Sequence, residues 1–255
     1  MSVDELHWRA EEACMAAWPA PREMLLDGWL LRAAGGGVRR PNSVNPIRGG
    51  ARDPSAVLPA VEAIYGALGQ AALFRVLSIT PEMDAVLEDH GYAAEGATLT
   101  LYNDIAGFAI PSDNNVSDGD AELAVIPGAA WLEARSELSR VAAAEARIFE
   151  TTVNSIMVPR AFAARREGEK IAALAYGVVC NGLGVIESVV TDETRRRRGY
   201  GRQVVGRLLQ WAKDEGAEGV CLQVVTDNEA ARGLYRSLGF TIELHSYHYR
   251  RKTQG

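Results

Sequence analysis

The chain has 255 residues, of which 47% are hydrophobic and 24% are charged, and its formal net charge is −6. These proportions are ordinary for a globular protein with a sizeable core, so the fold needs no metal or disulfide to hold it. The acidic balance, with a pI near 5.4, disfavours a nucleic-acid-binding protein, because such domains usually have a pI above about 9. No apolar run approaches the ~18 residues of a membrane span.

The amino terminus and the cysteines indicate a cytoplasmic protein. The first 18 residues are acidic and amphipathic and lack the basic and apolar regions of a signal peptide. There are three cysteines, Cys14, Cys180 and Cys221. Their number is odd, and no two of them form a CxxC motif. We therefore expect reduced thiols among apolar neighbours.

The first 110 residues predict alternating helices and strands. Apolar residues at helical spacing predict a helix over residues 4–18, which Pro19 ends. The elements that follow are separated by glycine, proline or other turn residues. They are a strand at 28–33, a turn at 35–37, an extended piece at 38–47, a helix at 54–69, a strand at 73–79, a helix at 81–91 and a strand at 97–104.

Residues 111–120 are polar and aperiodic, which predicts a linker between two halves, at 1–110 and 121–255. The second half again alternates helical and strand patterns. Its predicted elements are a strand at 121–126, one or two helices within 128–154, strands at 157–165, 170–179 and 182–190, a helix at 201–215, a strand at 219–225, a helix ending near 238 and a last strand at 240–249.

The two halves share an order of strand, helix, strand, helix, strand. "SVNPI" at 43 aligns with "SVVTD" at 188, and "LEDHGYAAEGATLTLY" at 87 aligns with "YRSLGFTIELHSYHYR" at 235, at nearly constant offset. The sequence therefore predicts an internal duplication. Chance similarity of short α/β units is the alternative.

The segment "TDETRRRRGYGR" at 191–202 carries the strongest functional signal. It lies between a strand and an amphipathic helix, where glycines and backbone N–H groups can bind a phosphate. A dinucleotide GxGxxG motif is excluded because Val204 stands at the third glycine. A Walker loop is excluded because Arg207 and Leu208 follow Gly206. A solvated basic surface and a nucleic-acid patch remain as alternatives.

The spacing Arg196-x-x-Gly199-x-Gly201 resembles the R/Q-x-x-G-x-G/A signature of the GNAT acetyltransferase superfamily. "ESVVTDETRRRRGYGRQVVGRLLQWA" is similar to the strand, pyrophosphate loop and helix of that superfamily, and "TDNEAARGLYRSLGF" is similar to its next helix and the start of its last strand. The resemblance covers about residues 121–250. It implies an α/β (α+β) fold with two acyl-CoA N-acyltransferase-like halves, each a mixed, largely antiparallel sheet flanked by helices.

The resemblance implies acetyl-CoA as the cosubstrate. Backbone amides of the loop are expected to bind its pyrophosphate, assisted by arginine side chains. The residues of this expected loop site are Arg196, Arg197, Arg198, Gly199, Tyr200, Gly201 and Arg202. The preceding strand is expected to pair with the pantetheine arm and to polarise the thioester carbonyl through a backbone N–H group. Its residues are Val189, Val190 and Thr191.

Three further residues have a structural reading beside the one that the resemblance implies. Asn228 is well suited to cap a helix, and in the superfamily the equivalent asparagine binds the cofactor arm. Tyr235 is either a core tyrosine or the acid that protonates the departing thiolate. Glu187 precedes the pantetheine segment by two residues, so it is a candidate base, an ion-pair partner or a residue at the solvent edge.

Metal chemistry is not expected from this sequence. Of the four histidines, His245 and His248 are three residues apart on a strand, so their side chains point to opposite faces. His7 and His90 are isolated. We also find no nucleophile–histidine motif.

The first half lacks the matching residues of the second. "RGGARDPSA" stands where the arginine loop is expected, and Thr80 and Leu87 stand near the positions of Asn228 and Tyr235. This predicts a degenerate half. For the polar segment that includes Arg39, Arg40 and Asn42, the sequence leaves three roles open: a wall of the acceptor pocket, a subunit contact or a sheet edge.

Together these features predict a cytoplasmic N-acetyltransferase that moves the acetyl group of acetyl-CoA to an amine by direct attack in a ternary complex. The alternative is a non-catalytic acyl-CoA-binding regulator on the same fold. We expect neither nucleic acid nor membrane as a partner. The acceptor, which can be a small molecule or a protein amine, is not readable from the sequence, and neither is the oligomeric state.

Overall fold

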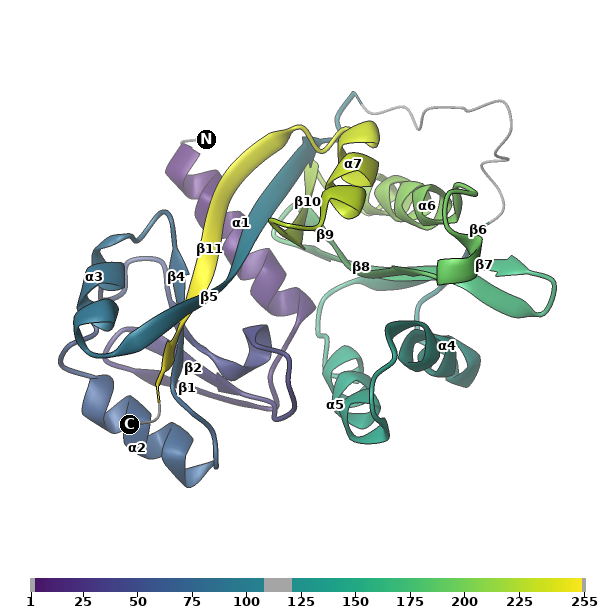
Figure 1. Ribbon diagram of the computed structural model, residues 1–255. Coiled ribbons are helices and arrows are strands. Elements are labelled where there is room, and N and C mark those ends of the chain that lie inside the picture. Colours follow the sequence, from purple (N-terminus) through teal and green to yellow (C-terminus); the bar gives the residue numbers. More distant parts are fainter. Residues whose placement is uncertain (1–2, 108–120, 254–255) are drawn as a thin grey trace. The chain divides into compact units, whose positions relative to one another are not determined.

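The computed structural model describes residues 3–107 and 121–253, so the expected linker at 111–120 lies outside the described residues (Figure 1). The elements follow one another in this order: α1 (Val3–Ala17), β1 (Arg22–Leu26), β2 (Trp29–Ala33), η1 (Arg40–Asn42), β3 (Val44–Pro46), α2 (Leu58–Ala67), β4 (Leu73–Leu77), α3 (Glu82–Asp89), β5 (Tyr92–Asp104), β6 (Ala121–Ala124), α4 (Ala129–Ser139), α5 (Ala143–Asn154), β7 (Arg160–Glu167), β8 (Lys170–Cys180), β9 (Leu183–Thr191), η2 (Glu193–Arg195), α6 (Tyr200–Asp214), β10 (Gly219–Val225), α7 (Glu229–Ser237) and β11 (Ile242–Lys252). Within the described ranges, no helix is both long enough and apolar enough to cross a membrane.

The chain packs into two compact units whose boundaries differ from the halves expected at 1–110 and 121–255. Among the described residues, the larger unit contains 3–19, 101–107, 121–224 and 228–243, and the smaller unit contains 20–100, 225–227 and 244–253. Helix α1 therefore belongs with the second half of the chain, and most of β11 belongs with the first.

Burial and strand pairing explain these two reassignments. The apolar stripe of α1, formed by Ala10, Ala13, Cys14 and Ala17, is fully buried, and the helix packs on β8 and β9. Strand β11 pairs antiparallel with β4, from Tyr247 opposite Leu77 to Arg251 opposite Leu73. Neither partner is visible from local sequence patterns, because both contacts join segments far apart in the chain.

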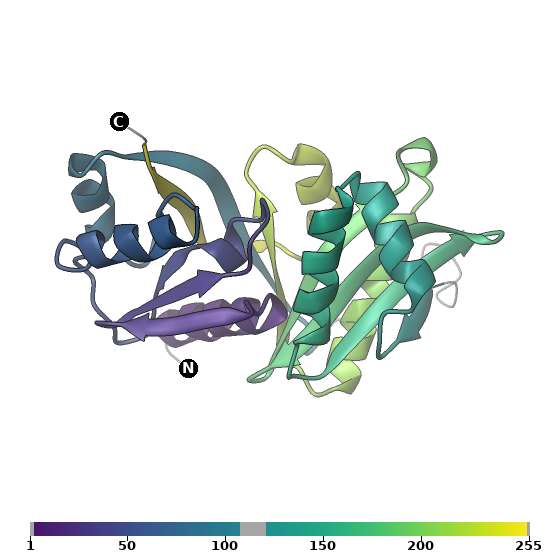
Figure 2. The same ribbon diagram turned by 90° about the horizontal axis from the view of Figure 1, so that it is seen from below.

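The larger unit is a mixed sheet with helices on both faces. Its strand order is β5-β10-β9-β8-β7-β6. Only β9 and β10 are parallel among the pairs whose register is described. Helix α6 lies on one face, where Leu208 and Trp211 approach Gly177. Helices α4 and α5 lie on the other (Figures 1 and 2), where Phe149 meets Tyr176 with ring centroids 6.1 Å apart.

The smaller unit places α2 and α3 over a sheet of order β1-β2-β3-β4-β11-β5. Strands β3 and β4 are parallel, whereas β1, β2 and β11 pair antiparallel with their described neighbours. Its core joins the inner sides of both helices to the sheet. The members are Trp29, Leu31, Val44, Val57, Leu58, Val61, Tyr65, Ala72, Phe74, Val76, Met83, Leu87 and Tyr92.

Both runs of strand, helix, strand, helix, strand that the sequence predicts are present. They are β3-α2-β4-α3-β5 and β9-α6-β10-α7-β11, and in each the first two strands pair in parallel. This order agrees with a mixed, largely antiparallel α/β fold. An origin by duplication remains a prediction.

Candidate functional site

Strand β9 carries a bulge at the position where the expected pantetheine segment begins. Tyr176 of β8 is paired with Glu187, but Leu174 is paired with Val190, so three steps of β9 match two steps of β8. Ser188, inside this bulge, has a left-handed backbone with φ of +52°. An extra residue of this kind bends a strand and changes where its backbone groups point. Nothing in the local sequence announces it, because serine is not a typical left-handed residue.

The parallel pairing of β9 with β10 ends just before the bulge. The described register runs from Leu183 opposite Gly219 to Ile186 opposite Leu222. On its other side β9 continues to pair with β8 through Val190 and Thr191. In residues 189–191, some backbone N–H and C=O groups point toward β10. These groups have no partner in the described β9–β10 register, because that register ends at Ile186. All three side chains are half-buried.

The loop after β9 is organised as a helix start without a side-chain cap. Asp192 caps the short turn η2 by accepting a hydrogen bond from the Thr194 N–H at 2.9 Å. Gly199 then occupies the N-cap of α6 with φ of +79°, a conformation that glycine adopts without strain. The first helical bond described runs from Gln203 N–H to Gly199 C=O at 3.0 Å. The N–H groups of the first turn, residues 200–202, thus face out of the helix, as in anion sites.

Carboxylates hold most arginine side chains of the loop. Glu167, at the end of β7, accepts hydrogen bonds from Tyr200 at 2.8 Å and from Arg198 at 2.9 Å, and it pairs with Arg195 at 3.0 Å. The Tyr200 hydroxyl and these two guanidinium groups keep the pKa of Glu167 below its ordinary value, with the Tyr200 hydrogen bond as the largest cause. Arg196 pairs with Glu193 at 3.4 Å. The sequence does not reveal that these arginines serve first to shape the loop.

Gly201 packs against protein rather than open space. A Cβ atom built there would lie 3.3 Å from both Leu234 Cδ2 of α7 and Thr191 Oγ1 of β9. The next residue, Arg202, donates hydrogen bonds to the backbone carbonyl and the hydroxyl of Ser237 at 3.3 and 3.0 Å. Helix α6 is therefore tied closely to α7 and to the end of β9.

Helix α7 carries the expected asparagine and tyrosine. The Asn228 side chain caps the helix by accepting a hydrogen bond from the Ala231 N–H at 3.1 Å, so the structural reading of this residue holds. Tyr235 is 8% exposed, and its ring meets Phe240 edge-on with centroids 6.0 Å apart. Burial, and then the charge of Glu187, raise the pKa of the Tyr235 hydroxyl well above its ordinary value. The hydroxyl is therefore protonated at neutral pH.

Glu187 is buried, with 7% of its surface exposed. It is directly opposite Tyr176, so its side chain lies on the sheet face that α4 and α5 cover. The influence of its charge on Tyr235 shows that the two expected catalytic residues lie near each other. The structure thus brings together Glu187, Tyr235, the bulged segment of β9 and the start of α6.

Sequence reasoning missed a second buried carboxylate. Glu11, on α1, is 1% exposed and accepts a hydrogen bond from Gln223 of β10 at 3.3 Å. Gln223 follows the last described pair of β9 and β10 by one residue. The amphipathic pattern of α1 indicates a helix, but only the tertiary packing reveals that it reaches this strand.

No cluster of three or more metal-ligating side chains occurs in the described part of the chain. His245 Nε2 lies 3.2 Å from Thr100 Oγ1, and His248 Nε2 lies 2.8 Å from Asp84. These two histidines take part in separate local networks.

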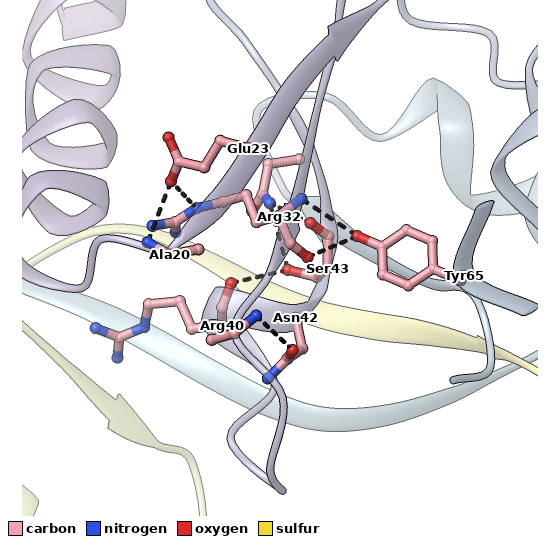
Figure 3. Close-up of polar contacts among 9 residues, drawn as sticks. Ala20, Glu23, Arg32, Arg40, Asn42, Ser43 and Tyr65 are labelled. Atoms are coloured by element: carbon pink, nitrogen blue, oxygen red, sulfur yellow. Dashed lines mark hydrogen bonds and ion pairs between the residues drawn. The ribbon is translucent and has the colours of Figure 1, made fainter. Parts of the chain in front are cut away.

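Side chains in the polar segment of the smaller unit form hydrogen bonds with backbone groups of the same unit (Figure 3). Asn42 accepts hydrogen bonds from the N–H groups of Ala34 and Gly35 at 2.9 and 2.8 Å. The Tyr65 hydroxyl donates to the Arg32 carbonyl at 2.8 Å, and the Arg32 side chain pairs with Glu23 at 2.9 Å. At least part of this segment is therefore structural.

The smaller unit does not repeat the helix start of α6. Helix α2, the counterpart of α6 in chain order, begins after Val57 and has proline in its first turn, at position 59. Proline has no N–H to donate. Thr80 and Leu87, near the positions expected to match Asn228 and Tyr235, are both fully buried.

Comparison with known proteins agrees with this architecture. The family described as "Probable histone acetyltransferase Rv0428c C-terminal" matches residues 8–250. The "Uncharacterized N-acetyltransferase YobR" of Bacillus subtilis is 27% identical over 251 residues, which cover 96% of this chain and 98% of that protein.

Two solved structures share the fold over nearly the whole chain. A GCN5-related N-acetyltransferase from Kribbella flavida has a TM-score of 0.72 at 18% identity, covering 97% of this chain and 96% of its own. A tandem GNAT protein from the clavulanic acid biosynthesis pathway has a TM-score of 0.66 at 14% identity, covering 98% and 94%.

The close packing at Gly201 gives a test of the site's geometry. Gly201→Val should lower the free energy of unfolding by about 1–3 kcal/mol, because the added side chain overfills the space beside Leu234 and Thr191. Denaturant titration measures the loss. Gly233→Val is the matched control, because position 233 is also helical but a Cβ atom there would meet nothing within 4 Å. Equal losses in both variants would show that helix propensity alone is responsible.

Proposed function

Because the chain belongs to the family described as "Probable histone acetyltransferase Rv0428c C-terminal", within the GNAT superfamily, we propose that it transfers the acetyl group of acetyl-CoA to an amine. The acceptor amine attacks the thioester directly while both substrates are bound. The observation that carries this proposal is the convergence of an uncapped helix start, a bulged strand end and a buried carboxylate–tyrosine pair.

The cosubstrate binds along β9 and the start of α6 in this proposal. Backbone amides within 197–202 bind the pyrophosphate, since helix N-termini favour anions. The unpaired side of residues 189–191 binds the pantetheine arm. The Arg196–Glu193 pair and the Glu167 cluster support this assignment by fixing the loop before the ligand arrives, which lowers the entropic cost of binding.

Glu187 and Tyr235 carry out the proton transfers of the proposed reaction. The bound acceptor, an ammonium ion at neutral pH, first passes a proton to Glu187, directly or through water. The neutral amine nitrogen then forms a bond to the thioester carbon, and the second proton that this nitrogen must lose passes to water. A backbone N–H of the bulged segment stabilises the developing oxyanion. The carbon–sulfur bond then breaks, and the Tyr235 hydroxyl donates its proton to the departing thiolate.

The charge of Glu187 couples these two proton transfers. As long as Glu187 is ionised, its charge helps to raise the pKa of Tyr235. When Glu187 takes the proton of the amine, that contribution disappears, and Tyr235 becomes a better acid at the step that needs one. Burial remains the larger cause of the raised pKa, so the hydroxyl acts mainly as a hydrogen-bond donor until the thiolate forms.

The loop can be tested by binding alone. Gly199→Ala should weaken CoA binding about ten-fold or more, because alanine disfavours φ of +79° and the strained N-cap shifts the amides. Gly216→Ala is a matched control, since Gly216 has φ of +83° just beyond the other end of α6 and a Cβ atom there would meet nothing within 4 Å. Calorimetry should show about one CoA per chain. Equal affinity in both variants would contradict the loop assignment.

Tyr235→Phe removes only a hydroxyl, so packing against Phe240 should persist. Turnover should fall by roughly 10²–10⁴-fold, the usual contribution of a general acid, while CoA affinity stays the same. Steady-state kinetics with calorimetry measures both. Tyr176→Phe is the control, because the Tyr176 hydroxyl is also buried but donates to the Ala17 carbonyl at 2.9 Å. That variant should lose stability and keep its turnover.

Glu187→Gln should lower kcat/KM by roughly 10²–10⁴-fold near neutral pH. The deficit should shrink as the pH rises toward the acceptor's own amine pKa, because the neutral amine then no longer needs a base. A pH–rate profile measures this convergence. Glu11→Gln removes the other buried carboxylate near β10. A larger and converging deficit in that variant would assign the base to Glu11 instead.

A further inference from the structure

Arg135 is a buried cation in the larger unit that the proposed mechanism does not use. It lies on α4, one turn after Trp131, whose indole N–H donates to the Ala163 carbonyl at 2.9 Å and anchors the helix. Residues four apart share a helix face, so Arg135 also points toward the sheet. Only 8% of its surface is exposed. Its guanidinium carbon lies 3.8 Å from the centre of the Phe149 ring.

The guanidinium group has no hydrogen bond or ion pair within residues 3–107 and 121–253, and its Nε atom is fully enclosed. Tyr176 and Glu145 affect it only through their charge, and burial is the largest cause that lowers the pKa of Arg135. The hydroxyl of Thr152, one helical turn from Phe149 on α5, is likewise buried without a partner in that part of the chain.

A buried arginine with unused donors is costly to the folded protein. Its enclosed Nε–H group loses its hydration, and an aromatic ring replaces only part of it. Arginine offers a planar fork that matches a carboxylate. The arrangement is therefore expected of a group that awaits an anionic ligand.

The position of Arg135 links it to the reacting centre. The Phe149 ring beneath its guanidinium group meets the Tyr176 ring with centroids 6.1 Å apart, and Tyr176 is the direct cross-strand neighbour of Glu187. Arg135, Tyr176 and Glu187 therefore lie on one face of the same sheet.

We propose that the acceptor is a small amino acid-like molecule, an amine that also bears a carboxylate, and that Arg135 binds this carboxylate. The proposal rests on the proposed acetyltransferase function and specifies its substrate class.

Matched acceptors test the chemistry. A series of ω-amino acids of increasing chain length is compared with the corresponding ω-amino carboxamides, in which the amine is almost unchanged but the negative charge is absent. The carboxylates should show a KM lower by on the order of ten- to a hundred-fold, as expected for hydrogen bonds between charged groups. The chain length with the lowest KM reports the spacing between the two sites.

Arg135→Met assigns the preference to the residue, because methionine keeps an apolar stem over Phe149. The KM of the carboxylates should rise to that of the carboxamides, with kcat and CoA affinity unchanged. Arg147→Met, an exposed arginine on α5, is the control and should change nothing. The melting temperature of Arg135→Met should stay the same or rise. A lower melting temperature with unchanged KM would show a structural role and overturn the proposal.

The outcomes separate this proposal from the underlying function. Equal KM values for carboxylates and carboxamides, or a preference for a lysine peptide with blocked ends, would overturn the assignment of Arg135 while acetyl transfer stands. If no amine is acetylated although CoA binds, the proposed function fails and this inference fails with it.

Discussion

The extra residue in β9 is the constraint from which the geometry of the site follows. By taking a left-handed conformation, Ser188 bends the strand just after its last described pair with β10. Such a conformation costs a non-glycine residue about 1–2 kcal/mol, so the surrounding structure must hold it in place. Pairing with β8 on one side does so. On the other side, backbone groups of residues 189–191 have no partner in the described register with β10, and these are the groups that we propose to bind the pantetheine arm.

The loop that follows is shaped by charge. Glu167 lies at the end of β7, remote in sequence from the loop. It accepts hydrogen bonds from Tyr200 and Arg198 and forms an ion pair with Arg195. Exposed ion pairs contribute little to stability individually. Their effect here is to restrict the loop, which leaves the amides at the start of α6 pointing outward. In the site that we propose, the main ligand-binding group of this arginine-rich loop is therefore its backbone.

The two faces of the sheet in the larger unit differ in the kind of side chain that is buried on them. The face beneath α6 is apolar, with Val204, Val205, Leu208 and Leu209 buried against it. The opposite face contains Glu187, and the helix α4 that covers it contributes Arg135. Both residues are more than nine-tenths buried. Buried ionisable groups are expensive and are concentrated at functional sites. The buried charged groups therefore lie on the face on which we propose that the chemistry takes place.

The sequence by itself determined the elements and the motif. Helical and strand periodicity, with glycine and proline at the boundaries, depends on neighbours a few residues apart, and so does the spacing from Arg196 to Gly201. The same local information indicated Asn228 and Tyr235 on one helix, because the family resemblance is carried by that continuous segment.

Only the tertiary structure decided which elements pack together and which side chains meet. The placement of α1 with the larger unit, the pairing of β11 with β4, the approach of Glu187 to Tyr235 and the enclosure of Arg135 all join residues distant in the chain. The bulge at Ser188 is local in sequence but arises from pairing with β8. The periodic spacing of apolar residues shows which side chains face a core. Which side chains they meet there depends on the whole fold.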